Sequence, residues 1–220
     1  GITVAGTHAI NVNAGPNDVV SLRHIAIVGV NTNPGGIRFL AGNTLIVEDS
    51  SIEAVNTGIS FEPNGDASLI LRNLQIRSRG THPEAVSGIQ IKPGAAGSAN
   101  IQAERLQISG SPIGILLQGP VNGTIRNSAV QSSTGYGVKA LGSGLNPVDV
   151  HLEETSITDS AVAGIFSEGS ESVLRLSGNT ISGNAQGLLS TSGGRILSYG
   201  DNKVRGNLTD GTATGTLTKQ

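Results

Sequence analysis

The most regular feature of the chain is a two-residue phrase, Gly followed by an aliphatic residue, which recurs along its length. Consecutive copies are 22, 30, 26, 23, 27 and 23 residues apart, and Ala9-Ile10 is a weaker, earlier copy. A repeat of about 25 residues predicts a solenoid, in which each repeat packs only against its neighbours. The copies are Gly36-Ile37, Gly58-Ile59, Gly88-Ile89, Gly114-Ile115, Gly137-Val138, Gly164-Ile165 and Gly187-Leu188.

A second phrase of eight residues follows each of these, with apolar residues at positions one, three and eight. In one copy Leu69 and Leu71 alternate with Ile70 and Arg72, which is the period of a β-strand. The clearest copies are 20–27, 45–52, 69–76, 150–157 and 174–181, and the more degenerate ones are 101–108, 123–130 and 197–204.

Positions five and six interrupt this alternation. Position five is often Asn, Asp or Gly, the residues that best tolerate the backbone angles of a sharp bend. We therefore predict a tight corner here, after which the chain resumes with the apolar residue at position eight. The turn-forming residues at position five are Asp49, Asn73, Asn127, Gly178 and Asp201.

Together the two phrases predict three short strands per repeat, one at the Gly-aliphatic phrase, one before the corner and one after it. A single repeat cannot bury its apolar face, whereas stacked repeats close an interior and pair every strand with its copies above and below. The predicted fold is all-β, a single-stranded right-handed parallel β-helix of about eight rungs. With rungs about 4.8 Å apart the stack is roughly 38 Å long. We expect one domain over residues 1–220, with rungs over about 2–204, a C-terminal cap over about 205–220 and no N-terminal cap.

Composition is consistent with this fold and excludes several functions. The chain has 32 glycines, 2% aromatic residues and 14% charged residues, which is unusual for a helical domain. Its net charge of −2 gives no electrostatic reason for nucleic-acid binding. It has no apolar run of 18 residues, so we expect no membrane insertion. The absence of Cys excludes disulfides and thiolate chemistry.

The repeat resembles the parallel β-helix repeats of the pectin lyase-like superfamily, from about Ile2 to Val204. The phrases at 36–39, 71–73 and 178–181 are the most similar. More narrowly, the chain is similar to exported bacterial β-helix proteins without assigned activity, and its end from Gly194 to Lys219 resembles theirs. This resemblance implies a secreted or cell-envelope location. Such proteins usually have a further N-terminal capping region, and we expect none in residues 1–220.

Position four of the second phrase points outward and alternates in charge from rung to rung. Residues one rung apart are close enough to interact, so we predict a column of opposite charges on one face. A binding strip for a charged polymer would have mainly one sign, because mixed signs cancel the attracting field. We therefore favour a structural role that fixes the register between rungs. The charge column comprises Arg23, Glu48, Arg72, Glu104, Arg126 and Glu153.

The resemblance implies where an active site would lie. Superfamily enzymes commonly act on the outer face of the first strand, hydrolases with clustered Asp residues and lyases with acidic calcium ligands and a basic residue. The corresponding positions here include no Asp, so neither pattern can be transferred. The carboxylates of that face, Glu62 and Glu168, are four rungs and about 19 Å apart. A glycosidase pair needs about 5–9.5 Å. We expect Glu62 to form an ion pair with Lys92.

The remaining candidates are a loop cluster and two residues on the outer face of the first strand. The loop cluster comprises Arg79, His82 and Glu84, and the outer-face residues are Lys139 and Phe166. The four histidines lack metal-ligand spacing, so we expect no metal and no cofactor.

These observations favour a non-catalytic, exported scaffold or surface-interaction module, whose partner could be a carbohydrate or a cell-surface component. A polysaccharide lyase or hydrolase, or a carbohydrate-binding module without turnover, is the alternative. Because the chain begins in the strand-like segment Ile2-Thr3-Val4, we also expect end-to-end self-association through an uncapped first rung.

Overall fold

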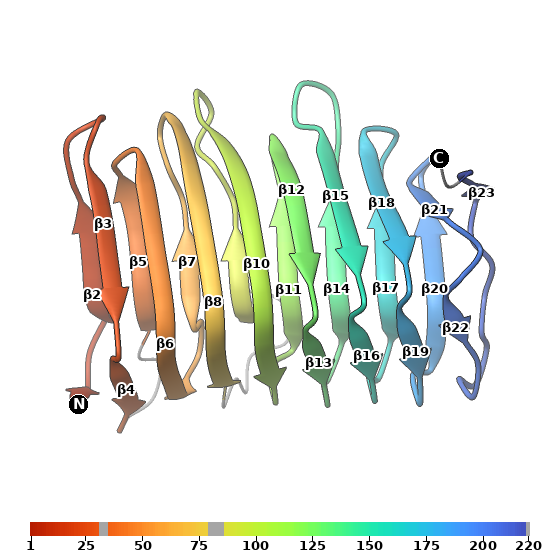
Figure 1. Cartoon of the computed structure of the whole chain (residues 1–220), viewed down its shortest axis with the longest axis horizontal. Helices are drawn as coiled ribbons and strands as arrows, with labels where there is room; N and C mark the ends of the chain where they lie inside the picture. Colours follow the sequence, from red (N-terminus) through yellow and green to blue (C-terminus); the bar gives the residue numbers. More distant parts are fainter. Residues whose placement is uncertain (31–34, 79–85, 219–220) are drawn as a thin grey trace.

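The computed structural model describes residues 1–30, 35–78 and 86–218. Within these residues the chain forms 23 β-strands and no helix. The strands stack side by side along one axis, so the two termini lie at opposite ends of the molecule (Figure 1). The predicted all-β solenoid is confirmed.

The Gly-aliphatic phrases form a parallel sheet of eight strands, one for each predicted rung. The register aligns the aliphatic residues in a single column, for example Ile37 with Ile59 and Ile59 with Ile89. In order, the strands are β2 (His8–Asn13), β5 (Gly35–Ala41), β7 (Ile59–Phe61), β9 (Ser87–Ile91), β11 (Ile113–Gln118), β14 (Tyr136–Leu141), β17 (Ala163–Glu168) and β20 (Gln186–Thr191).

The strands before and after the corner belong to a second sheet of fifteen strands. Most rungs have separate strands before the corner, namely β3 (Val19–Arg23), β12 (Val121–Arg126), β15 (Val148–Glu153), β18 (Ser172–Ser177) and β21 (Arg195–Ser198). After it come β4 (Ala26–Gly29), β13 (Ala129–Gln131), β16 (Ser156–Thr158), β19 (Thr180–Ser182) and β22 (Lys203–Val204). Three rungs continue through the corner in one strand, β6 (Thr44–Val55), β8 (Asp66–Ser78) and β10 (Ser98–Ser109), and β1 (Ile2–Val4) and β23 (Gly215–Thr216) lie at the ends.

The predicted corner is a column of residues with positive φ. Position five has φ between 47° and 64° in seven of the eight copies, and in the last copy the positive φ is at Gly200 rather than Asp201. The left-handed backbone therefore recurs even where the residue is His24, Arg105 or Glu154. A second corner, which the sequence argument did not predict, precedes the Gly-aliphatic strands. Its positive-φ residues are Ala54, Gly110, Ser132, Asp159, Gly183 and Gly206.

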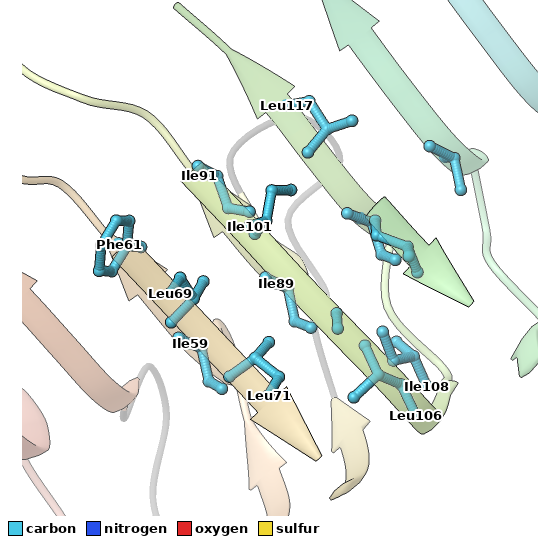
Figure 2. Packing of buried hydrophobic residues seen from close by; sticks show 14 of the residues in the cluster. Ile59, Phe61, Leu69, Leu71, Ile89, Ile91, Ile101, Leu106, Ile108 and Leu117 are labelled. Carbon is cyan, nitrogen blue, oxygen red and sulfur yellow. The ribbon is translucent and has the colours of Figure 1, made fainter. Parts of the chain in front are cut away.

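The core is the space enclosed by the two sheets. Side chains from both sheets, such as Ile59, Leu69 and Ile89, extend into this space (Figure 2) and are at most 1% exposed. Phe39 and Phe61 also stack in the interior, with ring centroids 4.6 Å apart. The core is therefore a continuous column, to which each rung adds one layer.

The glycine of each phrase is required by close packing. A Cβ on Gly137 would lie 2.5 Å from Cγ2 of Ile157 and 2.6 Å from the carbonyl oxygen of Gly164. Ile157 is the apolar residue at position eight, so the two phrases meet at this point. The recurring glycine allows that side chain and the neighbouring backbone to approach the strand closely.

Buried asparagines satisfy the backbone at both corners near the C-terminal end. Asn179 Oδ1 accepts a hydrogen bond from the Thr155 N–H (2.9 Å), and Asn179 Nδ2 donates to the Leu152 carbonyl (2.8 Å). At the second corner, Asn184 Oδ1 accepts from the Ser160 N–H (2.9 Å). Asn202 and Asn207 repeat the two arrangements one rung further along.

Candidate functional site

The charge column lies on the outer face of the strands that precede the first corner. Glu48 is bound by Arg23 at 2.8 Å and by Arg72 at 2.6 Å, from the rungs on either side. Glu104 is bound by Arg126 at 2.9 Å and, more loosely, by Arg72 at 3.7 Å. These ion pairs join five successive rungs, from β3 to β12.

The charge column departs from strict alternation at two points. Arg105, at the first corner of the same rung, also binds Glu104 at 3.2 Å. Arg126 and Glu153 are aligned in register, but no ion pair within 4.0 Å joins these two described residues. The guanidinium group of Arg126 donates its hydrogen bond to Glu104 instead. The alternation of charge along the column therefore does not by itself predict which neighbours form an ion pair.

The carboxylates of the charge column are sheltered by the arginines. The Glu48 and Glu104 side chains are 13% and 17% exposed, whereas Arg23, Arg72 and Arg126 are 45–58% exposed. The hydrogen bond from Arg126 lowers the pKa of the Glu104 carboxyl, and this outweighs the opposing effect of burial. Glu104 is therefore held ionised, which makes it a poor proton donor at neutral pH.

A second cluster of polar residues lies on the outer face of the Gly-aliphatic sheet. Glu62 pairs with Arg38 at 2.8 Å and accepts a hydrogen bond from Ser60. Burial alone would raise the pKa of Glu62, but the hydrogen bonds from Ser60 and Arg38 bring it below its ordinary value. The predicted Glu62–Lys92 ion pair does not form between these two described residues. Arg38 binds Glu62 from the preceding rung, through both Nε and Nη2.

The candidates Lys139 and Phe166 lie together on the same face. The rings of Tyr136 and Phe166 stack with centroids 5.0 Å apart, and Lys139 Nζ lies 4.8 Å and 5.6 Å from the two centroids. Phe166 is only 6% exposed. The two rings therefore pack against each other and against the Lys139 ammonium group in a cation–π cluster. They do not form an exposed aromatic surface on which a ligand could stack.

The remaining candidates, Arg79, His82 and Glu84, lie outside the described residues. The four-rung separation of Glu62 and Glu168 agrees with the strand order, in which β7 and β17 are separated by β9, β11 and β14. These two carboxylates are not brought together.

The structure reveals a groove that the sequence argument missed. Two adjoining depressions of about 360 Å³ each share His151 and Glu153 in their lining. We call them together the sheet groove. One depression continues over Gln102 and Thr124, and the other continues to Tyr199.

At the centre of the sheet groove, His151 contacts two later rungs. Its Nε2 lies 2.9 Å from Ser177 Oγ, and its ring centroid is 5.6 Å from that of Tyr199. Tyr199 directly follows β21. The register pairs Leu174 with Ile196, so the last copy of the second phrase begins at Ile196, one residue earlier than predicted, and Tyr199 is at the outward position four. The predicted copy 197–204 placed Tyr199 at the inward position three, which is why the sequence did not place it beside His151. The outward position of His151 next to Glu153 on β15 was the one signal in the sequence.

Two further findings concern metals and membranes. No group of three or more His, Asp and Glu residues is placed to hold a metal ion in the part of the chain that the structure describes. None of the described residues forms a helix that is long and apolar enough to cross a bilayer.

Comparison with known proteins identifies the family. Residues 95–218, more than half of the chain, match the family described as right handed beta helix region. Comparisons with curated proteins and with solved structures found no match. The matched segment begins just before β10 and covers every rung that follows it. Together with the stacked parallel strands, this match shows that the chain belongs to the right-handed β-helix family.

Proposed function

We propose that the chain is a non-catalytic β-helix scaffold that presents a surface for interaction, in a secreted or cell-envelope location. The right-handed β-helix supplies a rigid body, since each rung inside the stack is fixed by hydrogen bonds to the rungs on both sides. Its proposed partner is a carbohydrate or another component of a cell surface. The location follows from the resemblance to exported β-helix proteins.

The observation that supports this proposal best is the state of the outer-face carboxylates. Glu48, Glu62 and Glu104 are each bound by arginine. The pKa of Glu62 and that of Glu104 both lie below their ordinary value. Glycoside hydrolysis by a carboxyl pair needs one group whose pKa is raised, so that it is protonated at working pH. The surroundings of these carboxylates favour the opposite state.

Polysaccharide cleavage is the rival function, and a product assay separates the two. The chain is incubated with pectin, polygalacturonate, xylan and β-glucan, and reducing ends and unsaturated products are measured over time. We expect no release above that of the heat-denatured protein. Steady release that is abolished in Glu62→Gln or Glu104→Gln, with folding retained, would overturn the proposal and assign catalysis to that carboxylate.

A further inference from the structure

We propose that the sheet groove binds an uncharged oligosaccharide in an extended conformation. This inference rests on the proposed function and deepens it, because it names the site and the chemical class of the partner. The site is on the strands before the first corner, whereas the Gly-aliphatic sheet holds the Arg38–Glu62 and Tyr136–Phe166 clusters.

The dimensions of the groove favour an extended ligand. Its lining runs from Arg72 on β8 to Tyr199 after β21, across the strand order β8-β10-β12-β15-β18-β21. Five strand spacings of about 4.8 Å make this span about 24 Å. Both depressions are lined by His151 and Glu153, so they adjoin at these residues and one chain-like ligand can extend over both.

The groove also contains polar groups that the protein itself does not use. Among the described residues, the side-chain amide of Gln102, the hydroxyls of Thr124 and Tyr199 and the carboxylate of Glu153 make no hydrogen bond or ion pair with another side chain or the backbone. Amides and hydroxyls both donate and accept, and a carboxylate accepts from two donors. Sugar hydroxyl groups need this combination.

The charges of the lining argue against an anionic polymer. Arg72 and Arg126 stand beside Glu104 in one depression, whereas Glu153, Glu154 and Asp201 line the other without an Arg or Lys. This excess of carboxylates repels a polyanion. The rings of His151 and Tyr199 add apolar surface, against which the carbon–hydrogen face of a sugar can pack.

The test is calorimetric titration of the full chain with cellohexaose, xylohexaose and mannohexaose, with hexagalacturonate and hexalysine as charged comparisons. We expect at least one neutral hexamer to bind more tightly than either charged ligand. Gln102→Ala removes one hydrogen-bonding group and should weaken that binding about fivefold, and Tyr199→Ala should weaken it more strongly.

Gln107→Ala is the matched control, because Gln107 is also exposed on β10 but lies beyond the corner and outside the groove. It should leave binding unchanged. The inference is overturned if no neutral hexamer binds, if a charged ligand binds most tightly, or if Gln107→Ala weakens binding as much as Gln102→Ala. Binding accompanied by cleavage would overturn the proposed function and leave the groove assignment intact. Absence of binding would overturn the groove assignment and leave the proposed function intact.

Discussion

At the scale of single residues, the recurring glycines have a steric role. Each lies where the apolar side chain after the corner meets the backbone of the next rung. The carbonyl oxygen of Gly88 would be 2.5 Å from a Cβ on Gly58, just as Gly137 faces Gly164. A methyl group at such a point forces backbone and side chain apart, since neither neighbour is the free end of a flexible chain.

We predict that Gly137→Ala lowers the free energy of unfolding by about 1–3 kcal/mol, because the added methyl group overpacks the interior. Denaturant titration measures this change. Gly65→Ala is the control, since a Cβ at Gly65 has no atom within 4 Å, and it should change stability by no more than about 0.5 kcal/mol. Equal effects of the two substitutions would contradict the steric role.

A second residue-scale prediction concerns pH. Burial lowers the pKa of His8 from its ordinary value near 6.5, and the nearby Arg38 lowers it further. The unfolded chain therefore binds a proton on His8 more readily than the folded chain. Its contribution to stability is fully present above about pH 6.5 and is lost as the pH falls through the lower, folded value. The lowered pKa of Glu62 adds a further loss below about pH 4.5.

Unfolding temperatures measured between pH 7 and 4 test this prediction. His8→Gln should make the profile flatter below pH 6.5 and leave the loss below about pH 4.5 in place. His24→Gln, at a side chain that is 79% exposed, serves as the comparison and should follow the wild-type profile. An unchanged profile in His8→Gln would count against the assignment.

At the scale of elements, buried asparagines secure the corners. Asn179 joins three rungs, since it binds backbone groups of Leu152 and Thr155 and its Nδ2 also donates a hydrogen bond to Asn202 Oδ1. These backbone groups cannot pair within a sheet because the chain turns there. The side chain therefore replaces the missing strand hydrogen bonds.

We predict that Asn179→Ala lowers the free energy of unfolding by about 3 kcal/mol, because it leaves a buried N–H and a buried carbonyl without partners. Asn100→Ala provides the contrast, since Asn100 bonds to Asn122 on the exposed face. That substitution should cost no more than about 0.5 kcal/mol. Denaturant titration gives the free energy of unfolding of both variants. A loss in Asn179→Ala that is no larger than the loss in Asn100→Ala would show that burial of the hydrogen-bonded groups does not matter.

The charge column gives an element-scale prediction that depends on salt. Glu104→Gln leaves Arg72, Arg105 and Arg126 close together without their shared carboxylate. We expect a lower unfolding temperature at low ionic strength and a smaller difference in 0.5 M NaCl, since salt screens exposed charges. Glu53→Gln is the control, because Glu53 has no ion pair among the described residues. A deficit that salt does not reduce would argue against electrostatic repulsion.

At the scale of the whole molecule, the two ends of the stack differ. Residues beyond β22 bond to the last rung, for example Thr214 to Ile196 and Leu217 to Ser198. At the other end β2 and β3 have a described neighbour on one side only. Val20 and Ile10 are accordingly only partly buried, whereas Leu45 and Leu69 in the column of Val20 are fully buried.

We propose that this open edge pairs with a second copy of the chain. Light scattering should show mass increasing with protein concentration. Val20→Lys, which places a charge at the edge, should restore a monomer. Leu208→Lys, at an 89% exposed position near the opposite end, should not. A monomer at every concentration in the wild-type chain would contradict the proposal.

The candidate site was predictable only in part. The charge column followed from the spacing of outward residues, because register alone decides which residues are neighbours in a parallel stack. The pairing of Glu62 with Arg38 instead of Lys92 did not follow, since both partners are one rung away and side-chain conformation decides between them. The sheet groove was missed because the last copy of the second phrase begins at Ile196 and not at Leu197, so that Tyr199 points outward toward His151 and not into the core.

The sequence by itself determined the repeat length, the three strand positions of each rung and the first corner. Each of these is a local pattern copied about eight times, and the copies reinforce one another. The tertiary structure alone decided the second corner, the asparagine contacts and the choice of partner for each charged side chain. These depend on which atoms of different rungs meet after the chain has coiled. The asparagines do recur 23 residues apart, at Asn179 and Asn202 and at Asn184 and Asn207, but their spacing does not show which backbone groups they bind.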